Sequence, residues 1–294
     1  MPELPEVETM CRGIAPIVGQ TIVQINRPPC ERKAISIKPS VKTIAKKAVG
    51  QKVQRIDRLG KRVLIVLENE SAIVIEPRMT GLVLLADPPS TEHLRLQIIL
   101  HGKPDHNVLF WDRRGLGTVQ LLNPSELKRS VIDRLGPDAL VATADQLKSI
   151  LGTSRRAIKV ALLDQSAIAG VGNLYASEAL FVSGIDPRTR CDQLTKPQWQ
   201  RLCSAIHSVL REAIAHEGST LSDGTYRNAL NDAGSYQNYH RVYDRAVQTC
   251  KRCQTGSIRR IVQAQRSTFF CPDCQQRRGK HASVDAASPS VDQP

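Results

Sequence analysis

The sequence predicts an α+β protein of several domains: an N-terminal β-sandwich with flanking helices, a C-terminal helical domain and a small metal-binding β-hairpin. Three observations predict this order. Short β-rich runs fill the first part of the chain, whereas the runs after Thr143 have helical apolar spacing. Two Cys-x-x-Cys pairs stand near the C-terminus. A length of 294 residues allows more than one domain.

The N-terminal half is expected to begin with a helix over residues 6–18, because Pro5 suits a first helical turn and Glu6 favours its positive end. Turn residues separate the β-rich runs that follow. These runs are 21–26, 62–68, 72–76, 94–100, 107–111 and 118–122. Many short strands favour a sandwich or a barrel, and we place this domain over residues 1–137.

The second half is expected to be helical, with a tight glycine turn at residues 169–173. The predicted helices are 144–151, 155–165, 173–184 and 196–218. We place the helical domain over 138–246 and the metal module over 247–278. The last segment, 279–294, has too few apolar residues to pack and is predicted to be a disordered tail.

The charge balance indicates a nucleic-acid partner. The chain has 41 Lys and Arg against 28 Asp and Glu, a formal net charge of +13, and such basicity is typical of proteins that bind phosphate backbones. An anionic membrane surface is the competing partner. No apolar run approaches the roughly 20 residues that span a bilayer, and the first residues lack the layout of a signal peptide. We therefore expect no membrane association and a cytoplasmic, nucleoid-associated protein.

The cysteine spacing predicts one structural Zn²⁺ ion. Seventeen residues separate the pair Cys250 and Cys253 from the pair Cys271 and Cys274, and two such pairs can wrap a tetrahedral Zn²⁺. Four thiolates leave no open coordination position. The hairpin expected over 258–270 carries arginines that can meet phosphate. The other cysteines are interpreted as packing thiols. They are Cys11, Cys30, Cys191 and Cys203.

The chain begins Met1-Pro2-Glu3. Removal of Met1 would leave Pro2 with a free secondary amine, and an α-amino group has a pKa near ~8, so much of it is ready to act as a nucleophile. Attack on an electrophilic carbon would give an iminium, and Glu3 could supply a carboxyl for acid–base work. The alternative is an ordinary chain start that frays in solvent.

Five motifs in one order connect these features: PELPEVET at Pro2, Gly60-Lys61, RMTG at Arg78, AGVGNLYASEALF at Ala169 and QAQRSTFFC before Cys271. Over roughly residues 2–278 the chain resembles the bacterial formamidopyrimidine-DNA glycosylases of the formamidopyrimidine/endonuclease VIII family. The resemblance implies a β-sandwich, a helix–two-turn–helix domain and a four-cysteine zinc-finger hairpin. It also implies a monomer that acts on double-stranded DNA containing an oxidised base.

The resemblance implies the following catalytic roles. Pro2 is the Schiff-base nucleophile, Glu3 is the proton donor that opens the sugar, and Glu6 belongs to the active-site network. Lys61 contacts phosphate and is a proton donor for β-elimination. Arg266 contacts the same phosphate and is a proton donor for δ-elimination. The implied reaction removes 8-oxoguanine or formamidopyrimidines and then cleaves the strand by β,δ-elimination, without a redox cofactor or a catalytic metal.

The resemblance also implies DNA contacts. Asn173 binds phosphate, and Met79 and Arg114 fill the gap that an extruded base leaves. Leu116 stands where the family has a wedge phenylalanine, and it can wedge but cannot stack. Glu76 replaces a family histidine that touches phosphate, so it would repel DNA unless Arg78 or another cation pairs with it. Asp244 replaces a glycine, and 221–236 corresponds to the loop that covers the base.

These departures leave two alternatives open. One is the same chemistry with an endonuclease VIII-like preference for oxidised pyrimidines, and the other is a non-catalytic binder of damaged DNA. Leu4 and Met79 favour the formamidopyrimidine branch. The endonuclease VIII branch typically has glycine at the position of Leu4 and other residues in place of the Met79 wedge. The presence of both Pro2 and Glu3 argues against a binder without activity.

Overall fold

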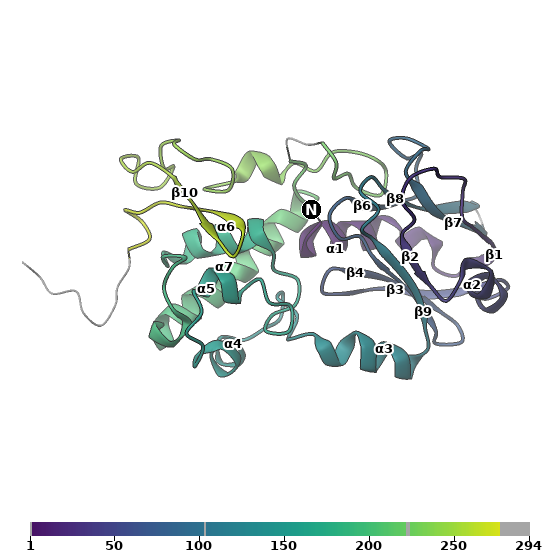
Figure 1. Cartoon of the computed structure of the whole chain (residues 1–294), viewed down its shortest axis with the longest axis horizontal. Helices are drawn as coiled ribbons and strands as arrows, with labels where there is room; N and C mark the ends of the chain where they lie inside the picture. The colour runs from purple at the N-terminus through teal and green to yellow at the C-terminus, as the bar shows by residue number, and fades with distance from the viewer. Residues whose placement is uncertain (1, 103, 222–223, 277–294) are drawn as a thin grey trace, which may run out of the picture.

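The computed structural model describes residues 2–102, 104–221 and 224–276 and has two lobes. The β-sheets form one lobe, the helices and a C-terminal hairpin form the other, and the chain begins between them (Figure 1). This arrangement confirms the predicted fold class. Met1 and the predicted tail at 279–294 lie outside the described residues.

Two sheets make the N-terminal sandwich. The four-stranded sheet has the order β1-β7-β8-β6, and the five-stranded sheet has the order β2-β9-β5-β4-β3. Neighbouring strands are antiparallel except for the parallel pair β2 and β9. The strands are β1 Thr21–Asn26, β2 Ser36–Lys38, β3 Val53–Leu59, β4 Arg62–Leu67, β5 Ala72–Glu76, β6 Gly81–Leu84, β7 Leu94–His101, β8 His106–Asp112 and β9 Thr118–Leu122.

The continuous apolar run of β4 is explained by burial on both faces. Alternate side chains of a strand point to opposite faces of the sheet. Val63 and Ile65 join the core between the two sheets, whereas Leu64 and Val66 form a second cluster on the outer face. Helix α3 (Pro124–Ser130) covers that outer face through Leu127.

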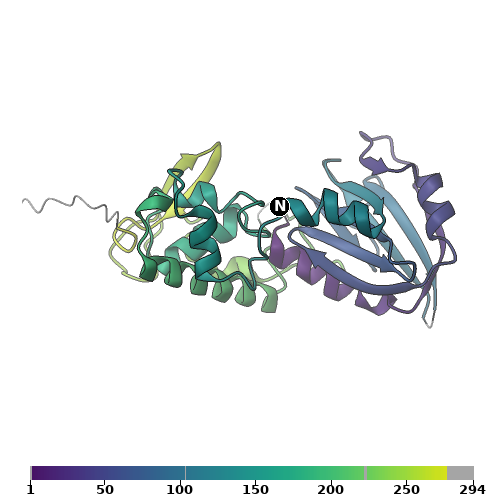
Figure 2. The same ribbon diagram turned by 90° about the horizontal axis from the view of Figure 1, so that it is seen from below.

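Helix α1 is shorter than the predicted 6–18. It spans Leu4–Gly13 and is followed by a 3₁₀ turn at Ala15–Ile17. Pro16 explains the early end, because its ring would clash with a carbonyl one turn earlier in an α-helix. Val7, Met10 and Ile14 join the sandwich core. Figure 2 shows α1, in purple, running along the sandwich to the junction of the lobes.

The helical lobe differs from the prediction at one helix. The helix predicted over 155–165 is only the single turn α5, Ile158–Ala161. Asp164 ends the helical path, because its carboxylate accepts bonds from the main-chain and hydroxyl groups of Ser166 and so favours a turn. The remaining helices and the hairpin lie close to their predicted positions. They are α4 Ala144–Leu151, α6 Asn173–Ser183, α7 Lys196–Ala215, β10 Arg259–Gln263 and β11 Arg266–Phe270.

Several elements have no counterpart in the sequence prediction. They are α2 (Val41–Ala48), β2, β3, β6, α3 and the 3₁₀ turns at Ile132–Arg134, Cys191–Gln193 and Tyr236–Tyr239. Strand β3 has an apolar residue only at every third position, at Val53, Ile56 and Leu59, so it lacks the strict alternation that predicts a strand. Among the described residues, no helix is both long and apolar enough to cross a membrane.

Candidate active site and metal cluster

The carboxylate of Glu3 lies at the N-terminus of α6, across the junction between the lobes. Its two oxygens accept hydrogen bonds from the main-chain N–H groups of Leu174 (3.0 Å) and Tyr175 (3.4 Å). The first N–H groups of a helix have no partner within the helix and carry partial positive charge. Glu3 is buried, so these bonds replace those that it loses to water. Pro2, also buried, precedes it directly.

The predicted glycine turn makes room for the start of the chain. A Cβ atom on Gly172 would lie 2.2 Å from Cδ of Glu3, and a Cβ atom on Gly170 would lie 2.4 Å from Cδ1 of Leu4. Gly170 also has a φ of +107° and accepts the main-chain N–H of Leu4 at 3.1 Å. Both glycines are therefore required by close approach. The two most specific sequence motifs pack directly against each other.

Glu6 holds this arrangement together through three hydrogen bonds. Its carboxylate accepts bonds from the N–H of Glu3 (2.8 Å), the hydroxyl of Tyr175 (2.5 Å) and the N–H of Ser219 (2.9 Å). Burial, together with the nearby charge of Glu3, raises the pKa of Glu6 above its ordinary value. Glu6 thus joins α1, α6 and the segment after α7 in one network.

Lys61 and Arg266 come to the same region from two β-hairpin turns. Lys61 follows Gly60 in the two-residue turn between β3 and β4. Burial lowers the pKa of Lys61, and the charge of Arg266 lowers it further, whereas the charge of Glu3 opposes the shift. Arg266 is the exposed first residue of β11 and follows a turn at Ala264–Gln265 in which both residues have positive φ.

Asn173, the first residue of α6, connects the helix to the C-terminal hairpin. Its side-chain amide donates to the main-chain carbonyl of Ser267 at 3.0 Å, and its side-chain oxygen accepts from Nζ of Lys159 at 2.5 Å. Lys159 is completely buried, and burial lowers its pKa to about 8. The sequence prediction missed Lys159, although a single lysine inside the apolar run of α5 is an available signal.

Met79 and Arg114 stand on two neighbouring turns of the sandwich. Met79 is half-buried in the turn between β5 and β6, and Arg114 and Leu116 are exposed in the loop between β8 and β9. The hydroxyl of Thr80 accepts the N–H of Arg114 at 2.9 Å, so the two turns touch directly. The structure therefore brings these three predicted DNA-contact residues onto one edge of the sandwich.

Two departures from the family pattern have local explanations. Glu76 forms ion pairs with Arg62 (3.1 Å) and Arg78 (3.4 Å), so cations pair with a carboxylate that would otherwise repel phosphate. Asp244 has a φ of +57°, a backbone conformation that favours glycine and that aspartate tolerates better than most residues.

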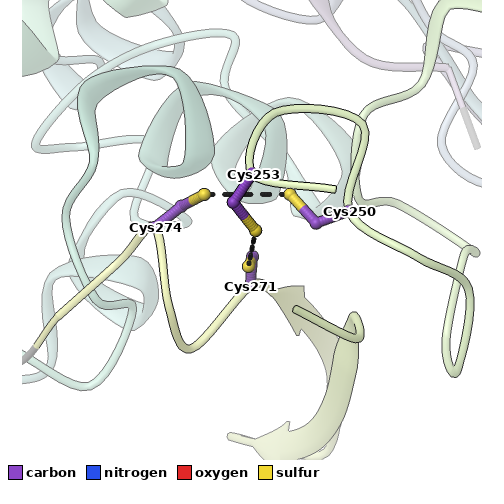
Figure 3. Close-up of side chains that lie close together, drawn as sticks. All are labelled: Cys250, Cys253, Cys271 and Cys274. Atoms are coloured by element: carbon purple, nitrogen blue, oxygen red, sulfur yellow. Dashed lines mark hydrogen bonds between the residues drawn. The ribbon is translucent and has the colours of Figure 1, made fainter. Parts of the chain in front are cut away.

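The four clustered cysteines fit a tetrahedral metal ion. Their Sγ atoms lie within 4.8 Å of one another, and both the Cys250–Cys274 and Cys253–Cys271 separations are 3.8 Å (Figure 3). A tetrahedral site with Zn–S bonds of about 2.3 Å has S···S edges of about 3.8 Å. The main-chain N–H of Gly256 donates to Sγ of Cys253, as expected for a thiolate ligand. The cluster can hold one metal ion.

The fold and site define a basic protein with a buried carboxylate near the start of its chain. Lysine and arginine side chains surround this carboxylate, an arrangement typical of a protein that binds a phosphate-rich polymer. Family models agree. Residues 1–119 match the formamidopyrimidine-DNA glycosylase N-terminal domain, and residues 135–225 match the formamidopyrimidine-DNA glycosylase H2TH domain.

The chain belongs to the formamidopyrimidine-DNA glycosylase family. It is 40% identical to the formamidopyrimidine-DNA glycosylase of Chloroflexus aurantiacus over 279 residues, covering 94% of this chain and 98% of the relative. The Paracoccus denitrificans relative of the same name is 36% identical, with 94% and 100% covered.

Solved structures have the same fold. The Lactococcus lactis Fpg in complex with DNA containing an abasic site has a TM-score of 0.83 at 30% identity, covering 94% of this chain and 100% of that one. The MutM (Fpg) protein from Thermus thermophilus has a TM-score of 0.81 at 35% identity, covering 93% and 98%.

The contact between Gly172 and Glu3 can be tested by a double-mutant cycle. We expect Gly172→Ala to destabilise the protein by about 2 kcal/mol, because the new methyl group displaces the Glu3 carboxylate from the α6 N–H groups. Urea unfolding gives the free energy. In a Glu3→Gly background the same change should cost much less. An equal cost in both backgrounds would show that Glu3 is not the group displaced.

The buried amine of Lys159 predicts a pH-dependent stability. Its lowered pKa means that the charged form destabilises the folded state below about pH 8, and this penalty disappears as pH rises toward the ordinary pKa. Lys159→Met should therefore raise the free energy of unfolding near pH 7 by on the order of 2 to 3 kcal/mol, and the gain should shrink near pH 10. Lys148→Met, at an exposed lysine, is the control. A gain independent of pH would contradict the assignment.

Proposed function

We propose that this protein is a bifunctional DNA glycosylase and AP lyase that removes oxidised purines from double-stranded DNA. The observation that carries the proposal is the Glu3 carboxylate, held beside Pro2 at the N-terminus of α6. Solved relatives support the substrate class. They include MutM in complex with DNA containing carbocyclic 8-oxo-G (TM-score 0.82, 30% identity) and the Lactococcus lactis Fpg in complex with DNA containing N7-benzyl-Fapy-dG. The comparisons favour this interpretation over the two alternatives.

In the proposed first step, the amine of Pro2 attacks C1′ of the damaged nucleotide. A bond forms between the proline nitrogen and C1′, and the glycosidic bond breaks so that the base leaves with its electron pair and takes up the proton that the nitrogen releases. Glu3 protonates the ring oxygen, the sugar opens, and the product is an iminium at Pro2. The reaction requires Pro2 to be the first residue, because a preceding Met1 would hold its nitrogen in an amide.

The iminium makes the neighbouring sugar carbon acidic, and loss of a proton from C2′ then expels the 3′ phosphate. A second elimination expels the 5′ phosphate. Lys61 and Arg266 are proposed as the proton donors of the two eliminations. Lys61 suits this task because burial and the charge of Arg266 lower its pKa toward the working pH.

Phosphate binding is assigned to Asn173, Lys61 and Arg266, with Lys159 as a further buried cation. Asn173 bonds to both Lys159 and the β11 main chain, so a phosphate at this point would meet groups that are already ordered. Such contacts hold the backbone in place while the base is extruded. Met79, Arg114 and Leu116 are proposed to fill the gap in the duplex.

The metal of the cysteine cluster is proposed to be one structural Zn²⁺. Four thiolates would saturate it, so it would take no part in the chemistry. Its role is to fold the hairpin that carries Arg266. Phe269 of that hairpin packs with Phe181 of α6 and with the buried cysteines. The hairpin, once folded around the metal, is therefore held against the helical lobe.

Borohydride trapping tests the proposed function. The protein with Pro2 as its first residue, verified by mass spectrometry, is incubated with a duplex containing 8-oxoguanine opposite cytosine. We expect a covalent adduct on reduction and a one-nucleotide gap without it. Glu3→Gln is the matched control, because it keeps the shape of Glu3 but cannot donate the proton, and it should lose excision while DNA affinity is retained. The absence of both adduct and cleavage with the unmodified protein would overturn the proposal.

Metal removal should weaken binding to all DNA, damaged or not. Without the ion the hairpin loses its folding energy, and Arg266 with it. We expect a chelator to lower duplex affinity at least tenfold and to reduce its dependence on salt, since fewer phosphates are neutralised. Added Zn²⁺ should restore the affinity. An affinity and salt dependence unchanged after the metal has been shown to leave would disprove this role.

A further inference from the structure

The strongest unexplained feature of the sandwich is a completely buried carboxylate, Asp112, at the end of β8. No cation forms an ion pair with this carboxylate among the interactions of the described residues. Its partners are instead one hydroxyl and two main-chain N–H groups from two different turns. We call residues 77–81 the Met79 turn and residues 113–117 the Arg114 loop.

Each oxygen of Asp112 has its own set of donors. Oδ1 accepts the hydroxyl of Thr80 at 2.5 Å and the N–H of Arg114 at 3.3 Å, and Oδ2 accepts the N–H of Gly117 at 2.7 Å. The Thr80 oxygen in turn accepts the N–H of Arg114 at 2.9 Å. Hydrogen bonds to a charged group are about twice as strong as neutral ones. Asp112 therefore closes the Arg114 loop on itself and ties it to the Met79 turn.

The surrounding backbone leaves little freedom for this arrangement. In the strand register Gly81 pairs with Asp112, and the N–H of Gly81 also closes the Met79 turn on the carbonyl of Pro77 at 2.9 Å. A Cβ atom on Gly117 would lie 2.5 Å from the Phe110 ring. Both ends of the Arg114 loop and the end of the Met79 turn are thus fixed to β8.

A buried arginine holds the other side of the Arg114 loop. Arg95, only 3% exposed, donates from Nε to the main-chain carbonyl of Asp112 at 2.9 Å and from Nη1 to the carbonyl of Lys33 at 3.0 Å. Gly115 has a φ of +63°, and a Cβ atom there would lie 3.0 Å from the Lys33 carbonyl. The loop is therefore bounded by the segment before β2 as well.

We propose that Thr80 and Asp112 are positioning residues that hold Met79 and Arg114 in one fixed arrangement, so that two side chains from different turns enter the same gap in the duplex together. The inference rests on the proposed function, which assigns gap filling to these side chains. Two independent turns would each lose conformational entropy on entering the DNA. Because the buried hydrogen bonds of Asp112 and Thr80 already order both turns when the protein folds, this entropy is lost on folding and not on DNA binding.

Thr80→Val tests the proposal with minimal change of shape. It removes the hydroxyl that links the two turns and leaves the Asp112 bonds to the Arg114 loop in place. Single-turnover excision of 8-oxoguanine from a duplex should fall about tenfold, the effect of one lost hydrogen bond to a charged group. Borohydride trapping at an abasic site in single-stranded DNA should stay within about twofold, because it needs no base extruded and no gap filled. Thr80→Ser keeps the hydroxyl and should restore duplex excision.

The outcomes are distinct. If the unmodified protein traps no abasic DNA, the proposed function fails. If it does, and Thr80→Val excises from duplex DNA at the unmodified rate, the positioning role is wrong. An equal loss on duplex and single-stranded substrates, or no recovery in Thr80→Ser, also overturns it, since either result indicates general damage to the site. Thermal unfolding of each variant shows whether the fold is retained.

Discussion

The structure depends on one contact, that between the Glu3 carboxylate and the N-terminus of α6. This contact joins the first residues of the chain to a helix that begins about 170 residues later, and it does so inside the protein. The carboxylate gains two main-chain donors and the favourable end of a helix dipole. It can reach them only because Gly172 has no side chain. The start of the chain, which is often disordered in proteins, is thereby fixed at the junction of the lobes.

Around this contact several ionisable side chains are buried close together. Glu3 and Glu6 lie together, and burial raises the pKa of Glu6 while it lowers the pKa values of Lys61 and Lys159. These shifts show that the folded site holds groups in environments that disfavour their charged forms, a cost to stability. A preorganised active site has this cost in stability, because its ionisable groups are held away from water before the substrate binds. Incoming phosphates would add negative charge near the lysine and arginine side chains and so favour their charged forms.

Much of the fold and site could be predicted from the sequence, because their signals are local. The CxxC pairs, the glycine turn and the β-rich runs are each contained in a few residues, and α4 and α6 begin where predicted. Some missed features are non-local. Arg58 bonds to both Glu8 and Asp138 and so ties the lobes together, but nothing in the segment around it indicates partners 50 and 80 residues away. The early end of helix α1 has a local cause instead, because Pro16 lies inside the predicted range and cannot continue the helix.

The departures from the family pattern have consequences that depend on what surrounds each residue. Glu76 faces Arg62 and Arg78, so one carboxylate and two guanidinium groups leave this edge of the sandwich positive rather than repulsive to phosphate. Leu116 belongs to a loop whose shape is set by main-chain bonds to Asp112 and by the carbonyl of Lys33. A loop held through its backbone tolerates a change of side chain at its tip, because the replaced atoms do not hold it. We therefore expect substitutions to be tolerated least at the buried positions that hold the loop and best at its exposed tip.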